Sequence, residues 1–169
     1  MLSVLGVAEV AQWCVLILLT VILTIVSISD IRYRRIPNWA VLAIIGLSIP
    51  WILLGFGPSI LSASAGILIA FGLTWPLYAL GMFGAGDSKL LMALALLVGL
   101  QKLLVFFVIV ALAGGVIALA SLLMNPTRAM VLFQMRGKGG YGREVPYGVA
   151  IAIAGIFVIA WPFARLTSG

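Results

Sequence analysis

Long apolar runs separated by short polar segments make up most of this 169-residue chain. The runs fall at about residues 8–29, 39–56, 60–83, 89–101, 103–124 and 146–166. A helical run of about 20 residues crosses a hydrocarbon core of about 30 Å, because each residue adds about 1.5 Å. Lipid offers the backbone no hydrogen bonds, which favours helices. We therefore predict an all-α, polytopic membrane helix bundle with about six transmembrane helices in one domain, residues 1–169.

Composition supports a membrane protein and excludes several kinds of site. The chain is 64% hydrophobic and 8% charged, and it contains no histidine. Its net charge of +6 comes from basic residues in the short segments between apolar runs, so these residues report topology and we expect no nucleic-acid partner. Cys14 is the one cysteine. We therefore expect neither a disulfide framework, nor a metal site, nor a cofactor.

The distribution of basic residues predicts the topology. The fourth apolar run is the weakest, because 13 residues reach only about 20 Å. If all six runs cross and segment 30–38 is cytoplasmic, eight of the ten basic residues are cytoplasmic and only Lys102 and Arg165 face out. Omitting the fourth run would put the basic segment 125–145 on the opposite side, against the positive-inside bias. We therefore predict six spans with both termini outside.

Two other segments carry weaker predictions. No Lys or Arg precedes Arg32, and the first apolar run is too long for a typical signal-peptide core, so we expect a retained transmembrane helix. Residues 127–136 alternate polar and apolar positions and are followed by the glycine-rich stretch 137–142. An interfacial helix followed by a flexible loop fits this pattern, as does an ordinary basic cytoplasmic loop.

Two of the four acidic residues, Asp30 and Asp87, lie at the edges of apolar runs. An ionisable group there is costly unless paired or hydrated, so its default interpretation is functional. Structural alternatives exist for each. Asp30 could pair with the arginines of segment 32–35, and Asp87 could be the N-cap of the fourth helix, as Asn38 could be of the second.

A cap does not explain glycine at both 84 and 86. Glycines clear side chains from the backbone beside Asp87, so that another chain can approach, which suits a peptide substrate. Two carboxylates that converge on one water share a proton, so one serves as base and the other as neutral acid, as an aspartic protease requires. We expect Lys89 to hold lipid phosphate or to influence Asp87 electrostatically.

Three motifs together resemble the type IV prepilin peptidases, membrane aspartic proteases of the GxGD class, and most closely their short Tad/Flp-pilus branch. They are Asp30 with Arg35-Ile36-Pro37-Asn38, then Gly84-Ala85-Gly86-Asp87-Ser88-Lys89-Leu90, and Pro146-Tyr147-Gly148 at the start of the last apolar run. The resemblance extends from about residue 10 to 165.

The resemblance implies a peptidase of the inner membrane. Asp30 and Asp87 would be the catalytic pair, with active-site support or substrate contact from Arg35, Pro37, Asn38, Gly84, Gly86, Lys89, Pro146, Tyr147 and Gly148. The implied substrate is a prepilin or pseudopilin in the membrane, whose short basic leader is cut at the cytoplasmic face. Longer members also methylate the new N-terminus and carry an extra region with Cys-x-x-Cys motifs. We find neither here, and therefore expect the peptidase activity alone, without a separate methyltransferase region.

Two other classes of function remain as alternatives. A proton-coupled membrane transporter would place its acidic residues near the middle of the bilayer. A non-catalytic subunit of a secretion or pilus assembly machine would leave the glycines beside Asp87 unexplained.

Overall fold

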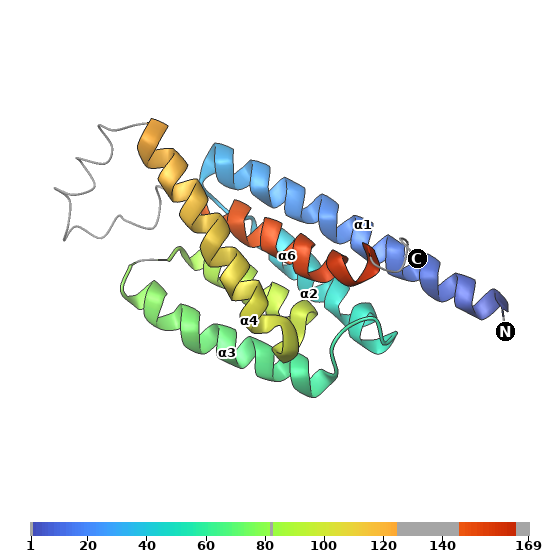
Figure 1. The fold of residues 1–169 in the computed structure, drawn as a ribbon. Helices are drawn as coiled ribbons and strands as arrows, with labels where there is room; N and C mark the ends of the chain where they lie inside the picture. Colours follow the sequence, from blue (N-terminus) through green and yellow to red (C-terminus); the bar gives the residue numbers. More distant parts are fainter. Residues whose placement is uncertain (1, 82, 125–145, 165–169) are drawn as a thin grey trace.

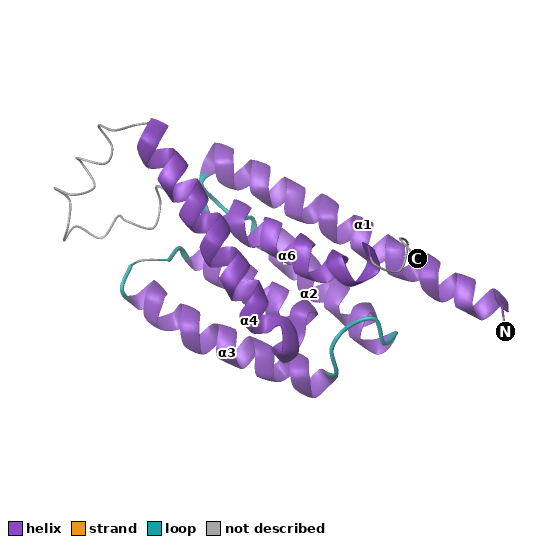
Figure 2. Cartoon of the chain, viewed as in Figure 1, coloured by secondary structure: helices purple, strands orange, loops and turns teal. Residues whose placement is uncertain are grey.

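The computed structural model describes residues 2–81, 83–124 and 146–164. Within these ranges the chain consists of helices and their connections, with no strand (Figure 2). The helices are α1 Leu2–Tyr33, α2 Asn38–Leu53, α3 Ile60–Ala79, α4 Ala85–Met124 and α6 Tyr147–Ala164. The all-α prediction is confirmed for the described part of the chain. The predicted interfacial helix at 127–136 and the loop after it lie outside the described residues.

A break at Gly99 divides α4 into two arms, residues 85–98 and 100–124, and the chain reverses there (Figure 1). The backbone of Gly99 has φ 70° and ψ 171°, a conformation that is essentially restricted to glycine, and a Cβ would overlap the Pro58 ring. The Leu100 N–H, freed by the break, donates to Ser62 Oγ on α3 at 3.0 Å. The two arms correspond to the fourth and fifth apolar runs.

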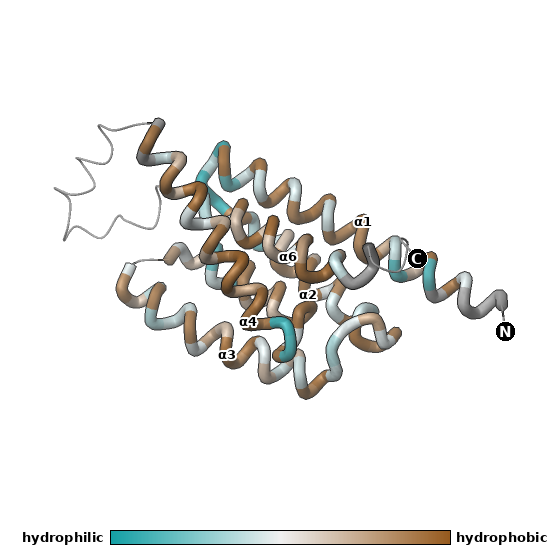
Figure 3. The backbone as a smooth tube through the Cα atoms, viewed as in Figure 1, coloured by the Kyte–Doolittle hydropathy of each residue, from teal (hydrophilic) through white to brown (hydrophobic). Residues whose placement is uncertain are grey.

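The outer surface of the bundle is that of a membrane protein. In the described part of the chain, three helical segments are long and apolar enough to cross a bilayer, namely Glu9–Tyr33, Ile60–Ala79 and Ala85–Ser121, and Asn38–Leu53 and Tyr147–Trp161 are shorter apolar helices. Large apolar side chains such as Leu61 and Leu104 are 80% and 75% exposed. Hydrophilic residues gather at helix ends and turns (Figure 3). A surface this apolar requires lipid as its solvent.

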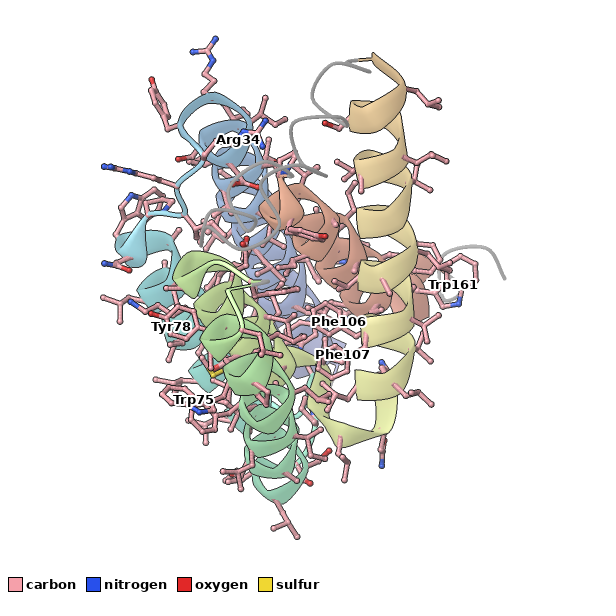
Figure 4. All side chains as sticks on the ribbon, turned by 90° about the vertical axis from the view of Figure 1, so that its left-hand side faces the viewer. Arg34, Trp75, Tyr78, Phe106, Phe107 and Trp161 are labelled. Carbon is pink, nitrogen blue, oxygen red and sulfur yellow. The ribbon has the colours of Figure 1, made fainter. Side chains whose placement is uncertain are left out.

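The interior is apolar and tightly packed. Leu23 of α1, Ile44 of α2, Phe106 of α4 and Ile151 of α6 are fully buried, and Phe106 and Phe107 lie among the helices in Figure 4. Small residues bring helices close together, as is common in membranes. A Cβ on Gly66 of α3, for example, would lie 3.1 Å from the carbonyl oxygen of Ala95 in α4.

The two ends of the bundle differ in the helix connections that lie there. The α1–α2 connection, the α3–α4 connection and the start of α6 lie toward one end, whereas the α2–α3 connection and the Gly99 turn lie toward the other (Figure 1). Asp30 precedes the first of these connections and Asp87 follows the second. The fold therefore brings both aspartates to the same end of the bundle.

Candidate active site

Asp30 lies in the last turn of α1, and its side chain is only 6% exposed. A helix C-terminus has no free N–H groups to offer, and its dipole disfavours a negative charge. The donor comes instead from another helix, because the Gly148 N–H in the first turn of α6 donates to Asp30 Oδ2 at 2.8 Å. The 146–148 motif thus reaches the first aspartate directly.

Gly148 has no space for a side chain. A Cβ built on it would lie 2.8 Å from Asp30 Oδ2 and 3.0 Å from Asp30 Cγ, both closer than ordinary van der Waals contact. The absence of a side chain lets the α6 backbone approach the carboxylate closely enough to donate its hydrogen bond.

Asp87 lies in the first turn of α4 and is 8% exposed. The structural alternative in which Asp87 is the N-cap residue is wrong, because α4 begins at Ala85 and Gly84 directly precedes it. Asp87 occupies the third helical position, and its carboxylate accepts a hydrogen bond from the backbone of Gly84. A side chain at this position can satisfy the N-cap N–H, as in a capping box.

Both aspartates line one cavity of about 310 Å³. Its lining residues are Asp30, Arg34, Arg35, Ile36, Asn38, Gly84, Ala85, Gly86, Asp87 and Lys89. The Asp30 and Asp87 carboxylates are close enough to interact electrostatically, and the charge of Arg34 acts on Asp30. The fold therefore unites two buried acids, 57 positions apart in the sequence, with basic side chains around them.

Side chains of the protein itself lie close to the positions that a Cβ on Gly84 or Gly86 would take. A Cβ on Gly84 would lie 2.8 Å from Asp87 Oδ2, and a Cβ on Gly86 would lie 3.1 Å from the Cβ of Ile36. The sequence suggested that these glycines make room for a substrate. Both glycines line the cavity and leave room there for Asp87 and for the connection between α1 and α2, and the expectation that they also admit a substrate stays a prediction.

The connection between α1 and α2 forms one wall of the cavity. Arg34 adopts a left-handed conformation with φ 52° just after the end of α1, a position where helices commonly end in this way. The Ser29 hydroxyl donates to the carbonyl oxygen of Arg35 at 2.8 Å and so holds the connection against α1. Sequence reasoning missed Ser29, although its position next to Asp30 was an available signal.

The start of α2 also differs from the prediction. Pro37 is the N-cap residue, in an extended conformation, and Asn38 is the first helical residue, so the prediction of Asn38 as N-cap was wrong. The Asn38 side chain has another partner, because its Oδ1 accepts a hydrogen bond from Lys89 Nζ at 3.5 Å. This contact joins the first and second motifs across the cavity.

Four of the predicted residues, Pro37, Pro146, Tyr147 and Gly148, are absent from the cavity lining, although Gly148 contacts Asp30. The Tyr147 ring stacks on Phe83, with ring centroids 5.3 Å apart and an interplanar angle of 27°. It also lies against Gly114, where a Cβ would be 3.2 Å from the ring. Tyr147 therefore fixes the start of α6 against the α3–α4 connection and the second arm of α4. Sequence reasoning missed Phe83 and Gly114.

Within the described ranges, no group of three or more His, Cys, Asp or Glu side chains could hold a metal ion. Asp30 and Asp87, which line one cavity, can act as a carboxylate pair. Two acids that share a proton can take a proton from water and donate one to a carbonyl oxygen.

Fold and site together define an α-helical membrane protein with two buried aspartates in one cavity at the end of a helix bundle. Comparison with known families gives a match to the type IV leader peptidase family over residues 17–119, which include both aspartates. The chain belongs to this family. The family predicted from the three motifs is thereby confirmed.

Two curated relatives extend the comparison. The prepilin leader peptidase/N-methyltransferases of Aeromonas salmonicida (strain A449) and Aeromonas hydrophila are each 27% identical to this chain over 153 residues. The alignments cover 86% of this chain and 48% of each relative, so the chain spans about half the length of these relatives. No solved structure gives a significant match.

Proposed function

We propose that this protein is an aspartic endopeptidase that removes the short basic leader from type IV prepilins or prepilin-like proteins at the cytoplasmic face of the membrane. The burial of Asp30 and Asp87 in one cavity is the observation that carries the proposal. Membership of the type IV leader peptidase family and the names of the relatives support it. The proposal is confined to peptide hydrolysis, whereas the relatives' names also include an N-methyltransferase.

In the proposed reaction, one aspartate is ionised and the other is protonated. The ionised carboxylate takes a proton from water as the water oxygen attacks the scissile carbonyl carbon. The protonated partner donates its hydrogen bond to the carbonyl oxygen, which gains negative charge. Collapse of the tetrahedral intermediate breaks the C–N bond, and a proton passes from the acid to the leaving amine. Burial of both groups strengthens these interactions, because the effective dielectric constant is lower than in water.

We further propose six membrane spans with both termini outside, in the inner membrane. The two arms of α4 would supply the fourth and fifth spans, although the first arm of 14 residues is only about 21 Å long. Arg34, Arg35 and Lys89 line the same cavity as the aspartates, and by the positive-inside bias this supports a cytoplasmic position for the cavity.

The positions of the two acids favour a peptidase over a proton-coupled transporter. Asp30 lies in the last turn of α1 and Asp87 in the first turn of α4, so both are at helix ends. A proton pathway across the bilayer needs ionisable groups near mid-span. A water-accessible end is where a leader peptide can meet the carboxylates.

The test is to coexpress the protein with an epitope-tagged prepilin and to follow loss of the leader by gel mobility. We expect Asp30→Asn and Asp87→Asn each to slow cleavage by about 10²- to 10⁴-fold, the usual contribution of general acid–base catalysis. The matched control is Glu9→Gln, which makes the same chemical change at an exposed position of α1. Equal membrane yields would establish that all the variants fold. Wild-type rates in both aspartate variants would refute the assignment.

A further inference from the structure

A second cavity of about 320 Å³ lies between α3 and the first arm of α4. It is lined by Phe71, Thr74, Trp75, Tyr78, Ala85, Ser88, Lys89 and Met92, and we call it the α3–α4 groove. Ala85 and Lys89 line both this groove and the catalytic cavity. The two spaces are therefore neighbours that share a wall in the first turns of α4.

The groove differs from the catalytic cavity in chemistry. Phe71, Trp75 and Tyr78 follow one another at helical spacing on one face of α3. The ring centroids of Phe71 and Trp75 are 5.6 Å apart, and those of Trp75 and Tyr78 are 6.3 Å apart. In Figure 4, Trp75 and Tyr78 lie one above the other along α3, with Tyr78 nearer to the end of the bundle that holds Arg34. The aromatic row thus leads away from the catalytic end.

The two hydroxyls of Thr74 and Ser88 in the groove already have backbone partners four residues earlier in the chain. The Thr74 hydroxyl donates to the Ala70 carbonyl at 2.8 Å, and the Ser88 hydroxyl donates to the Gly84 carbonyl at 3.2 Å. Neither hydroxyl therefore needs a hydrogen bond from an occupant. Apart from Lys89, which also lines the catalytic cavity, the groove offers an apolar, largely aromatic surface that suits an apolar side chain.

We infer that the α3–α4 groove holds the apolar segment of the substrate that follows the scissile bond. This inference rests on the proposed function. A prepilin whose scissile bond lies at the Asp30 and Asp87 carboxylates of the peptidase has a polar leader on one side of that bond and a membrane-embedded apolar segment on the other. Because Ala85 and Lys89 line both spaces, a segment that leaves the carboxylates has only the first turns of α4 to pass before it reaches the groove. From there the aromatic row on α3 leads away from the end of the bundle that holds Arg34 (Figure 4).

Site-specific photo-crosslinking tests the occupant. Trp75 is replaced by benzoylphenylalanine, which keeps an aromatic ring at this position, in the Asp87→Asn variant coexpressed with tagged prepilin. The matched control carries the same probe at Leu73, which is half-exposed on the same helix and does not line the groove. We expect a prepilin adduct from position 75, mapped by mass spectrometry to the apolar segment, and at least tenfold less adduct from position 73. Equal yields, or adducts with lipid alone at position 75, would overturn the inference.

Kinetics with purified enzyme and prepilin provide a second measurement. We expect Phe71→Ala and Trp75→Ala each to raise KM about tenfold, with kcat little changed, because they remove apolar contact from binding and not from the reacting atoms. Leu73→Ala should leave both constants unchanged. Unchanged KM in the two groove variants would overturn the inference, while cleavage by the wild type would leave the proposed function standing. Failure of the wild type to cleave prepilin would instead reject the proposed function itself.

Discussion

Replacing Gly148 with alanine puts a methyl group too close to the Asp30 carboxylate. The added carbon would be 2.8 Å from Asp30 Oδ2, whereas ordinary contact begins at 3.4 Å. The carboxylate must therefore retreat by about 0.6 Å, which stretches the 2.8 Å hydrogen bond from the Gly148 N–H beyond the usual range for N–H···O bonds. Because a misplacement of about 1 Å can cost about 100-fold in rate, we expect kcat to fall by about 10- to 100-fold.

The loss should be catalytic and not a loss of fold. Alanine is a better helix former than glycine by up to about 1 kcal/mol, which opposes any destabilisation from the displaced side chain. The matched control is Gly46→Ala in α2, where a Cβ would have no neighbour within 4 Å. We expect the control to cleave prepilin at the wild-type rate.

The assay is leader removal from purified prepilin under single-turnover conditions, with thermal unfolding measured on the same preparations. A Gly148→Ala variant that is folded and cleaves as fast as the control would refute the reasoning. In that case the approach of α6 to Asp30 would not be needed in the catalytic state. The cleavage rate of the Asp30→Asn variant serves as the lower limit with which the rate of Gly148→Ala is compared.

Two further predictions concern packing. Gly99→Ala should destabilise the protein by about 3 kcal/mol or more, because a side chain is strained at this φ and ψ and overlaps Pro58. The temperature of thermal unfolding should therefore fall strongly. The control Gly115→Ala, which has open space at the added carbon, should leave that temperature unchanged. Tyr147→Phe should retain wild-type cleavage and stability, whereas Tyr147→Ala should lose about 0.5–1.5 kcal/mol of stacking on Phe83 in addition to its buried area, measured by chemical denaturation in detergent. Equal stabilities for the two Tyr147 variants would contradict a packing role.

The apolar runs predicted most of the helices, because hydrophobic length is a direct physical requirement of the bilayer. Residues 39–56 and 60–83 became α2 and α3, and residues 146–166 became α6. The break within α4 was predicted less well, since the predicted apolar runs 89–101 and 103–124 put the boundary at Lys102. The chain turns at Gly99, where the backbone conformation and the close approach of Pro58 decide the position.

The candidate site could be predicted as a set of motifs but not as a set of contacts. The acids were recognisable because charge is expensive near lipid. The donor to Asp30 is a backbone N–H of Gly148, and a backbone group leaves no side-chain signature in the sequence. The same limit applies to Gly84 and Gly86, whose neighbours Asp87 and Ile36 are set by the packing of helix ends.

The hydrogen bond between Gly148 and Asp30 joins residues 118 positions apart, so the site can be completed only late in the synthesis of the chain. A ribosome adds about 5–20 residues per second, so about 6–24 s separate the translation of Asp30 from that of Gly148. During that interval the first helix carries its acid without the main-chain donor that later holds it. Nascent chains that stop before the last helix should therefore be inserted but inactive, and prepilins that meet them in the membrane should keep their leaders.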